Sequence, residues 1–181
     1  ESDWAEDYRL SSMVGDVIGC IDATTSGPVD VVGHSLGGLV AMVLASEHPQ
    51  LVRRLVIADI GPELHHVASP AEGASAVTFA SHEAAVADLR ARHPITPTEV
   101  LRDRVMHGLV RDPAGGWRWR HDPAVDDMSA DPALHRLWSH WESVVAPTLV
   151  IRGGESTVLP DELVQRMQRR SHATVDLAFI P

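Results

Sequence analysis

The fold of this chain is decided by eight residues, Val-Val-Gly-His-Ser-Leu-Gly-Gly at positions 31–38. The run 28–32 before the glycines has the apolar β-formers of a strand, and the apolar run 39–45 has the pattern of a helix. Residues 33–37 therefore fit Gly-x-Ser-x-Gly in the order strand, tight turn, helix. A glycine-rich turn that binds phosphate or only packs tightly is the alternative, and the apolar runs on both sides favour an exposed, reactive Ser35.

Such a turn makes specific demands on its residues. It strains the backbone of Ser35 and points the hydroxyl out over the edge of the sheet. We expect Gly33 and Gly37 to lack side chains because a Cβ on either would collide with backbone across the turn. The helix that follows points its free N–H groups and partial positive charge at the serine oxygen, which favours a developing oxyanion.

Composition excludes several classes of partner. The chain has 181 residues, enough for one domain or one domain with an insertion, and 44% hydrophobic residues, enough for a core. Its formal net charge of −10 argues against nucleic acid and anionic membrane as partners. Cys20, the single cysteine, is predicted to be a small core residue, and without a disulfide the expected location is the cytoplasm. The sequence shows no signal-peptide pattern and no apolar run long enough to span a bilayer.

A parallel sheet is predicted from the strands and helices around the turn. An apolar stripe at helical spacing from Leu10 to Ile21 predicts a helix that the breakers at 26–28 end. The run 55–60 has little alternation, which is typical of a strand buried on both faces. Further strands are predicted at 148–151 and 174–180, and right-handed crossovers would make all of them parallel.

Residues 62–145 differ in character and are predicted to form a mostly helical insertion. Ser81 is expected to cap one helix, and Thr-Pro-Thr-Glu at 96–99 is expected to be a capping box that opens another. Asp131 with its proline begins a third, and the alternating run 117–120 predicts a short strand. The expected domain limits are therefore 1–61 and 146–181 for the two parts of the core, with the insertion between them.

The chain resembles the α/β-hydrolase family over nearly its whole length. The resemblance rests on four runs: Gly-His-Ser-Leu-Gly-Gly at 33–38, Asp-Ile-Gly-Pro-Glu at 59–63, Trp-Arg-Trp-Arg-His-Asp-Pro at 117–123 and Pro-Thr-Leu-Val-Ile-Arg-Gly at 147–153. It implies an α/β fold with a mostly parallel sheet flanked by helices. It also implies that residues 33–37 form the nucleophile elbow, and that 62–145 is the mainly helical cap of a serine hydrolase.

The resemblance implies a catalytic triad in the chain order serine, acid, histidine. Ser35 is the nucleophile, and the backbone N–H of Leu36 is one oxyanion donor. The family's usual place for the acid follows the strand at 148–152, where this chain has Ser156. Some members carry the acid one strand earlier, which in this chain is Asp59, and we favour that residue.

Alternatives to Asp59 remain. Glu155 and Asp161 lie beside the usual place of the acid, and Asp59 could merely cap the loop that follows it. The resemblance also implies a second oxyanion donor before Glu1 and a catalytic histidine beyond Pro181. The chain is therefore predicted to be a fragment of a longer hydrolase and to have little or no activity alone.

Histidines and tryptophans supply the candidate substrate contacts. His34 lies in the turn, aimed away from the serine hydroxyl, and is predicted to border the substrate rather than to act as base. Trp138 and Trp141 are predicted to line an apolar substrate pocket, with Trp117 and Trp119 also candidates; ordinary packing is the alternative for all four. His65 and His66 are candidates for the pocket mouth. The histidine spacings match no metal motif, so packing or solvated histidines and no metal are expected.

These features predict a hydrolase that cleaves a carboxylic ester or lactone in a small molecule through an acyl-enzyme on Ser35, without a cofactor. A carbon–carbon bond hydrolase with the same triad is one alternative. A non-catalytic binding protein that retains the fold is another, although such a protein has no need of a strained serine between glycines. Haloalkane dehalogenases and epoxide hydrolases of this fold use an aspartate nucleophile, so Ser35 argues against both. The sequence does not predict an oligomeric state.

Overall fold

The computed structural model describes residues 5, 7–64, 77–126 and 131–181. Contacts divide these residues into two units, of which one holds 77–126 and the other holds 7–64 together with 131–181. The insertion limits predicted from sequence, 62 and 145, stay a prediction. His65 and His66 lie outside the described residues.

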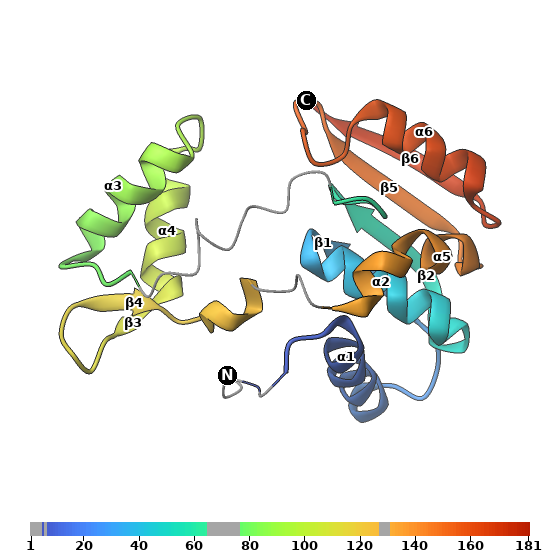
Figure 1. Ribbon diagram of the computed structural model, residues 1–181, viewed down its shortest axis with the longest axis horizontal. Helices are drawn as coiled ribbons and strands as arrows, with labels where there is room; N and C mark the ends of the chain where they lie inside the picture. Colours follow the sequence, from blue (N-terminus) through green and yellow to red (C-terminus); the bar gives the residue numbers. More distant parts are fainter. Residues whose placement is uncertain (1–4, 6, 65–76, 127–130) are drawn as a thin grey trace. The chain divides into compact units, whose positions relative to one another are not determined.

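The larger unit is built on a four-stranded sheet in the order β1-β2-β5-β6, with every neighbouring pair parallel (Figure 1). Its strands are β1 (Val29–His34), β2 (Val52–Ala58), β5 (Thr148–Gly153) and β6 (Val175–Ile180). The predicted parallel arrangement is confirmed. Because the strands are parallel, their carboxyl ends lie at one edge of the sheet, where sheets of this kind place their sites.

Four helices accompany this sheet: α1 (Leu10–Thr24), α2 (Leu36–Glu47), α5 (Leu137–Ser143) and α6 (Asp161–Arg170). Short 3-10 turns lie at Pro49–Leu51 and Pro132–Arg136. The buried carboxylate of Asp131 accepts the N–H of Ala133 at 2.8 Å and that of Leu10 at 2.7 Å. The helix start predicted at Asp131 is thus confirmed, and the same carboxylate caps the beginning of α1.

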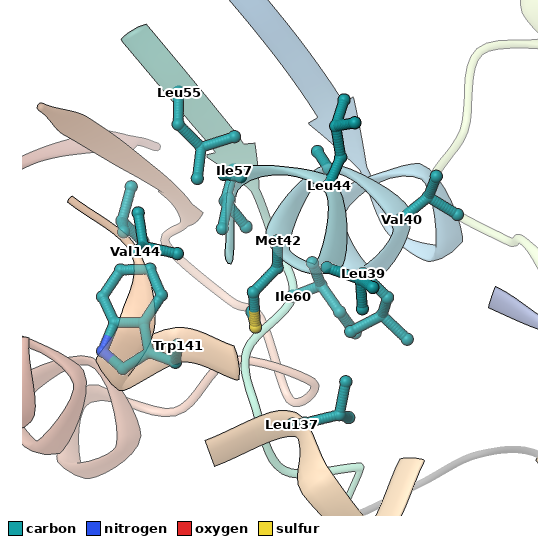
Figure 2. Packing of buried hydrophobic residues seen from close by; sticks show 14 of the residues in the cluster. Leu39, Val40, Met42, Leu44, Leu55, Ile57, Ile60, Leu137, Trp141 and Val144 are labelled. Atoms are coloured by element: carbon teal, nitrogen blue, oxygen red, sulfur yellow. The ribbon is translucent and has the colours of Figure 1, made fainter. Parts of the chain in front are cut away.

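Helix α2 lies at the centre of the core. It contacts α1, α5, β1 and β2, and all its residues from Gly38 to Ala45 are buried. Figure 2 shows side chains of α2 packed among those of β2, the segment after it and the α5 region. The labelled residues are Leu39, Val40, Met42, Leu44, Leu55, Ile57, Ile60, Leu137, Trp141 and Val144. A helix apolar on all sides is typical of a buried position, so the elbow is anchored in the most buried element of the unit.

The prediction that Cys20 is a core residue is wrong, because its side chain is exposed. Helix α1 buries Leu10, Val14 and Ile21, which lie on one helical face as the apolar stripe predicted. Cys20 is one residue before Ile21 and is therefore turned by about 100° from the buried face.

The smaller unit has its own core. Helices α3 (His82–Arg92) and α4 (Thr98–Gly108) pack together, and strands β3 (Leu109–Arg111) and β4 (Trp117–Trp119) form an antiparallel pair. A 3-10 turn follows at Pro123–Asp126. The buried side chains of its core are Phe79, Ala85, Leu89, Leu101, Val105 and Leu109.

One of the two predicted caps in this unit forms. The Ser81 hydroxyl accepts the N–H of Ala84 at 3.2 Å and caps α3 as predicted. The capping box at 96–99 is wrong, since α4 begins at Thr98 with Pro97 as its N-cap residue. The Arg90 guanidinium donates to the Thr96 carbonyl and the Thr98 hydroxyl, so this side chain, rather than a capping box, joins α3 to the start of α4.

Among the described helices of both units, none has the length and apolar content required to cross a membrane.

Candidate active site

Ser35 lies between β1 and α2 in a left-handed conformation, with φ 51° and ψ −124°. It is the N-cap residue of α2, and its side chain is exposed. A left-handed serine is costly and persists only where the surrounding structure holds it. The strain and exposure predicted for this serine are confirmed.

Close packing of backbone explains the glycines of the turn, with one correction. A Cβ on Gly33 would lie 2.2 Å from the carbonyl oxygen of Gly37, so glycine is required at 33. A Cβ on Gly37 would meet no atom within 4 Å, so the collision predicted there is wrong. The second required glycine is Gly38, where a Cβ would lie 2.4 Å from Cγ2 of Ile60.

Helix α2 begins directly after Ser35. The N–H groups of Gly38 and Leu39 donate to the Ser35 carbonyl at 2.8 Å and 3.3 Å. Leu36 is the first residue of the helix, and an N–H at this position has no partner within the helix. The geometry is therefore compatible with the predicted oxyanion donor.

Asp59 comes directly after β2 and also has a positive φ, 55°. Its N–H donates to the Ile151 carbonyl at 2.8 Å, and its Oδ1 accepts the N–H of Gly153 at 3.1 Å. Its side chain is partly buried. These two bonds fix Asp59 against the end of β5.

The ends of three adjacent strands are thus joined at one place. The Ser35 N–H donates to the carbonyl of Ala58, the last residue of β2, at 3.2 Å. Ser35 and Asp59 therefore lie at the ends of neighbouring strands. They are also the two non-glycine residues with positive φ in the described part of the chain.

The alternative acids have other roles or surroundings. Asp161 forms an ion pair with Arg152 at 3.3 Å. Glu155 is exposed in the turn after β5. The Ser156 hydroxyl, at the family's usual acid position, accepts the N–H of Leu159 at 3.1 Å.

The two predicted tryptophan contacts differ in burial. Trp141 has no exposed surface, and its Nε1–H donates to the Met167 carbonyl at 2.8 Å. Trp141 was predicted either to line a substrate pocket or to pack in the core, and its burial agrees with core packing. Trp138 is partly buried and donates from Nε1 to Glu63 at 2.8 Å, so its contact with substrate stays a prediction. His34 is exposed at the end of β1, next to Ser35 in the sequence.

The tryptophans of the smaller unit are in contact with neighbouring side chains. The Arg111 guanidinium lies 4.2 Å from the centre of the Trp117 ring, and the His82 ring lies 4.0 Å from it. Arg104 lies 5.9 Å from the centre of the Trp119 ring. These contacts describe packing within the unit.

His140 is a buried histidine far along the chain from the turn. Its Nδ1 lies 3.2 Å from the Ser46 hydroxyl and 3.9 Å from the Glu47 carboxylate. Burial lowers the pKa of His140, and this effect exceeds the opposing attraction of Glu47. In the parts of the chain that the structure describes, no group of three or more His, Cys, Asp and Glu residues is placed to hold a metal ion.

A comparison with family models decides the classification. The model of the Alpha/beta hydrolase family matches residues 1–180. The chain belongs to the α/β-hydrolase family. This confirms the predicted family and fold class.

Individual relatives of this α/β-hydrolase are hydrolases by name. An esterase of Mycobacterium tuberculosis is 30% identical over an alignment of 183 positions that covers 94% of this chain and 59% of the esterase. A 3-hydroxybutyrate-oligomer hydrolase of Cupriavidus necator is 31% identical over an alignment of 193 positions that covers 93% of this chain and 64% of that enzyme. The chain therefore spans less than two thirds of the length of either relative.

A solved structure agrees with the fold. The crystal structure of an E-2-(acetamidomethylene)succinate hydrolase superimposes with a TM-score of 0.85 at 27% identity. The superposition covers 98% of this chain and 68% of that one.

Sequence reasoning missed the role of Glu63, which accepts hydrogen bonds from α5 and α6. Its partners, Trp138 and Arg166, are 75 and 103 residues away along the chain, so local spacing does not indicate them. The one available signal is a carboxylate directly after the Gly-Pro that leaves β2.

Proposed function

We propose that this α/β-hydrolase, as an intact protein, cleaves carboxylic ester or lactone bonds through an acyl-enzyme on Ser35. The observation that carries the proposal is the strained, exposed Ser35 at the N-terminus of a buried helix, hydrogen-bonded to the end of the strand that Asp59 follows. The names of the relatives, an esterase and an oligomer hydrolase, support hydrolysis of esters.

Each residue has a defined role in the proposed reaction. The Ser35 oxygen attacks the carbonyl carbon of the ester while a histidine takes the hydroxyl proton. The Leu36 N–H donates to the oxyanion that forms, and Asp59 orients the histidine and stabilises its positive charge. The histidine then returns the proton to the departing alcohol, which leaves an acyl group on Ser35. Water hydrolyses this ester in a second, similar step.

The histidine and the second oxyanion donor are proposed to lie outside residues 1–181. Within the described part of the chain, no histidine hydrogen-bonds to Ser35 or Asp59, and His34 is attached to the turn itself. His34 and Trp138 are retained as candidate substrate contacts, and Trp141 is assigned to packing because it has no exposed surface. No cofactor or metal takes part in the proposed chemistry, and the expected partner is a small ester.

A fluorophosphonate probe tests the assignment of the nucleophile. The intact protein is treated with the probe, digested and analysed by mass spectrometry. We expect one adduct, on the peptide that contains Ser35, and none in the Ser35→Ala variant. Ser156→Ala is the matched control because Ser156 follows the end of β5 at the same edge of the sheet; this variant should be labelled normally. An intact protein that leaves Ser35 unlabelled would favour the non-catalytic alternative.

A further inference from the structure

The segment that leaves β2, residues 59–64, is enclosed by two helices. Ile60 packs against Gly38 of α2, where even a Cβ would lie 2.4 Å from Cγ2 of Ile60. Gly61 is also closely packed. A Cβ on Gly61 would lie 3.1 Å from side-chain atoms of each of Leu159, Leu163 and Met167. The two residues after Asp59 are therefore held by close packing.

Glu63 anchors the far end of this segment. Its Oε1 accepts the Nε1–H of Trp138 at 2.8 Å, and its Oε2 accepts from the Arg166 guanidinium at 2.5 Å. The Glu63 side chain is only 21% exposed. Hydrogen bonds between charged groups are stronger than neutral ones, and reduced exposure limits their screening.

Both partners of Glu63 lie on helices of the same unit. Trp138 belongs to α5 and Arg166 to α6. The Arg170 guanidinium, one turn further along α6, lies 4.1 Å from the centre of the Trp138 ring. Such a cation–aromatic contact restricts the ring whose N–H reaches Glu63.

We propose that Glu63 is a positioning residue for Asp59. A left-handed aspartate persists only where its surroundings hold it. The anchored Glu63 keeps the segment from relaxing, so Asp59 stays at φ 55° with Oδ1 on the Gly153 N–H. The proposal rests on the proposed function, in which Asp59 is the acid.

The proposal has a kinetic signature. An acid that is less well oriented holds the histidine less well in the proton-transfer steps. Loss of the anchor should therefore lower kcat. It should also weaken the Asp59–Gly153 hydrogen bond, which amide hydrogen exchange measures independently of activity.

The experiment compares Glu63→Ala with Asp30→Ala in the intact protein. The Asp30 carboxylate accepts from the Arg53 guanidinium at 2.8 Å and 2.9 Å and so also joins two elements of the larger unit, β1 and β2. Its side chain is 40% exposed, and it lies outside residues 59–64. We expect Glu63→Ala to lose about 10- to 100-fold in kcat for p-nitrophenyl acetate, with faster exchange of the Gly153 amide. Asp30→Ala should change neither.

Two further variants test the proposal even if Glu63→Ala does not fold. Glu63→Gln keeps an oxygen that can accept from Trp138 and should recover part of kcat. Trp138→Phe keeps the ring and removes the N–H, so it should speed exchange at Gly153. If exchange at Gly153 stays at the wild-type rate in Glu63→Ala, or in Trp138→Phe where the first variant does not fold, the proposal is overturned.

The same data separate the two proposals. If Asp59→Asn retains activity while Glu63→Ala still speeds exchange at Gly153, the anchoring stands and Asp59 is not the acid. If Asp59→Asn is inactive while Glu63→Ala changes neither exchange nor kcat, the acid stands and the anchoring is wrong.

Discussion

The Oδ1 atom of Asp59 accepts a hydrogen bond from the backbone N–H of Gly153, with 3.1 Å between oxygen and nitrogen. The bond joins the residue after β2 to the last residue of β5. It fixes one oxygen of the carboxylate through the backbone of the neighbouring strand. The carboxylate is therefore already oriented within the sheet, as electrostatic preorganisation of a catalytic acid requires.

Asp59→Asn in the intact protein should abolish most activity while preserving the fold. Asparagine keeps an oxygen for the Gly153 N–H and removes the negative charge that the histidine needs. Loss of the acid from a serine triad lowers kcat by about 10⁴-fold, which turnover of p-nitrophenyl acetate measures. Glu155→Gln and Asp161→Asn are the controls and should stay near wild type. Near-normal turnover by Asp59→Asn would remove this residue from the triad.

Gly33→Ala should destabilise the larger unit. The new Cβ would lie 2.2 Å from the Gly37 carbonyl oxygen, in backbone that cannot move without displacing Ser35. Overpacking of this kind costs about 1–3 kcal/mol, measured as the free energy of unfolding in urea. Gly37→Ala is the matched control, because nothing lies within 4 Å of its Cβ. That variant should be as stable as wild type or gain up to about 1 kcal/mol from helix propensity.

Stability should fall as the pH drops below about 6.5, the pKa of an unperturbed histidine. Burial lowers the pKa of His140 in the folded protein, so the unfolded chain takes up a proton first. The contribution of His140 is therefore complete above pH 6.5 and is lost as the pH falls toward the lower, folded value. Urea unfolding at a series of pH values measures the effect.

His140→Gln should reduce this pH dependence, because the variant lacks the imidazole whose pKa burial lowers. Equal pH dependence in wild type and His140→Gln would show that another group is responsible.

The 181-residue chain, produced alone, should hydrolyse p-nitrophenyl acetate no faster than its own Ser35→Ala variant. The proposed base and second oxyanion donor lie outside it, and an isolated serine hydroxyl is a weak nucleophile at neutral pH. Rapid turnover that depends on Ser35 would instead show that a histidine within the chain acts as base.

Local sequence patterns predicted the sheet and the elbow because their signals are short-range. The apolar run of β2 and the glycine at 33 are each visible within a few consecutive residues. The structure confirms the strand and the close packing at Gly33. The run 96–99 failed as a capping box because α4 begins at Thr98 with Pro97 as its N-cap residue, which leaves Thr96 one residue too early to cap it.

Contacts between residues far apart in the sequence could not be predicted from local patterns. Gly38 is required because Ile60 approaches it, and Glu63 finds its partners on helices far along the chain. Cys20 was misplaced because one step around a helix separates a buried face from an exposed one. The turn around Ser35 could therefore be predicted from its motif, whereas the contacts that hold residues 59–64 required the structure.

The most direct test of the account is the acyl-enzyme itself. The intact protein is mixed with p-nitrophenyl acetate, and the reaction is quenched in acid within the first turnover. The protein is then digested, and the masses of its peptides are measured by mass spectrometry. The account predicts one added acetyl group on the peptide that contains Ser35, absent from Ser35→Ala and formed more slowly in Asp59→Asn. Rapid release of p-nitrophenol with no acetyl group on Ser35, or with the group on another residue, would contradict it.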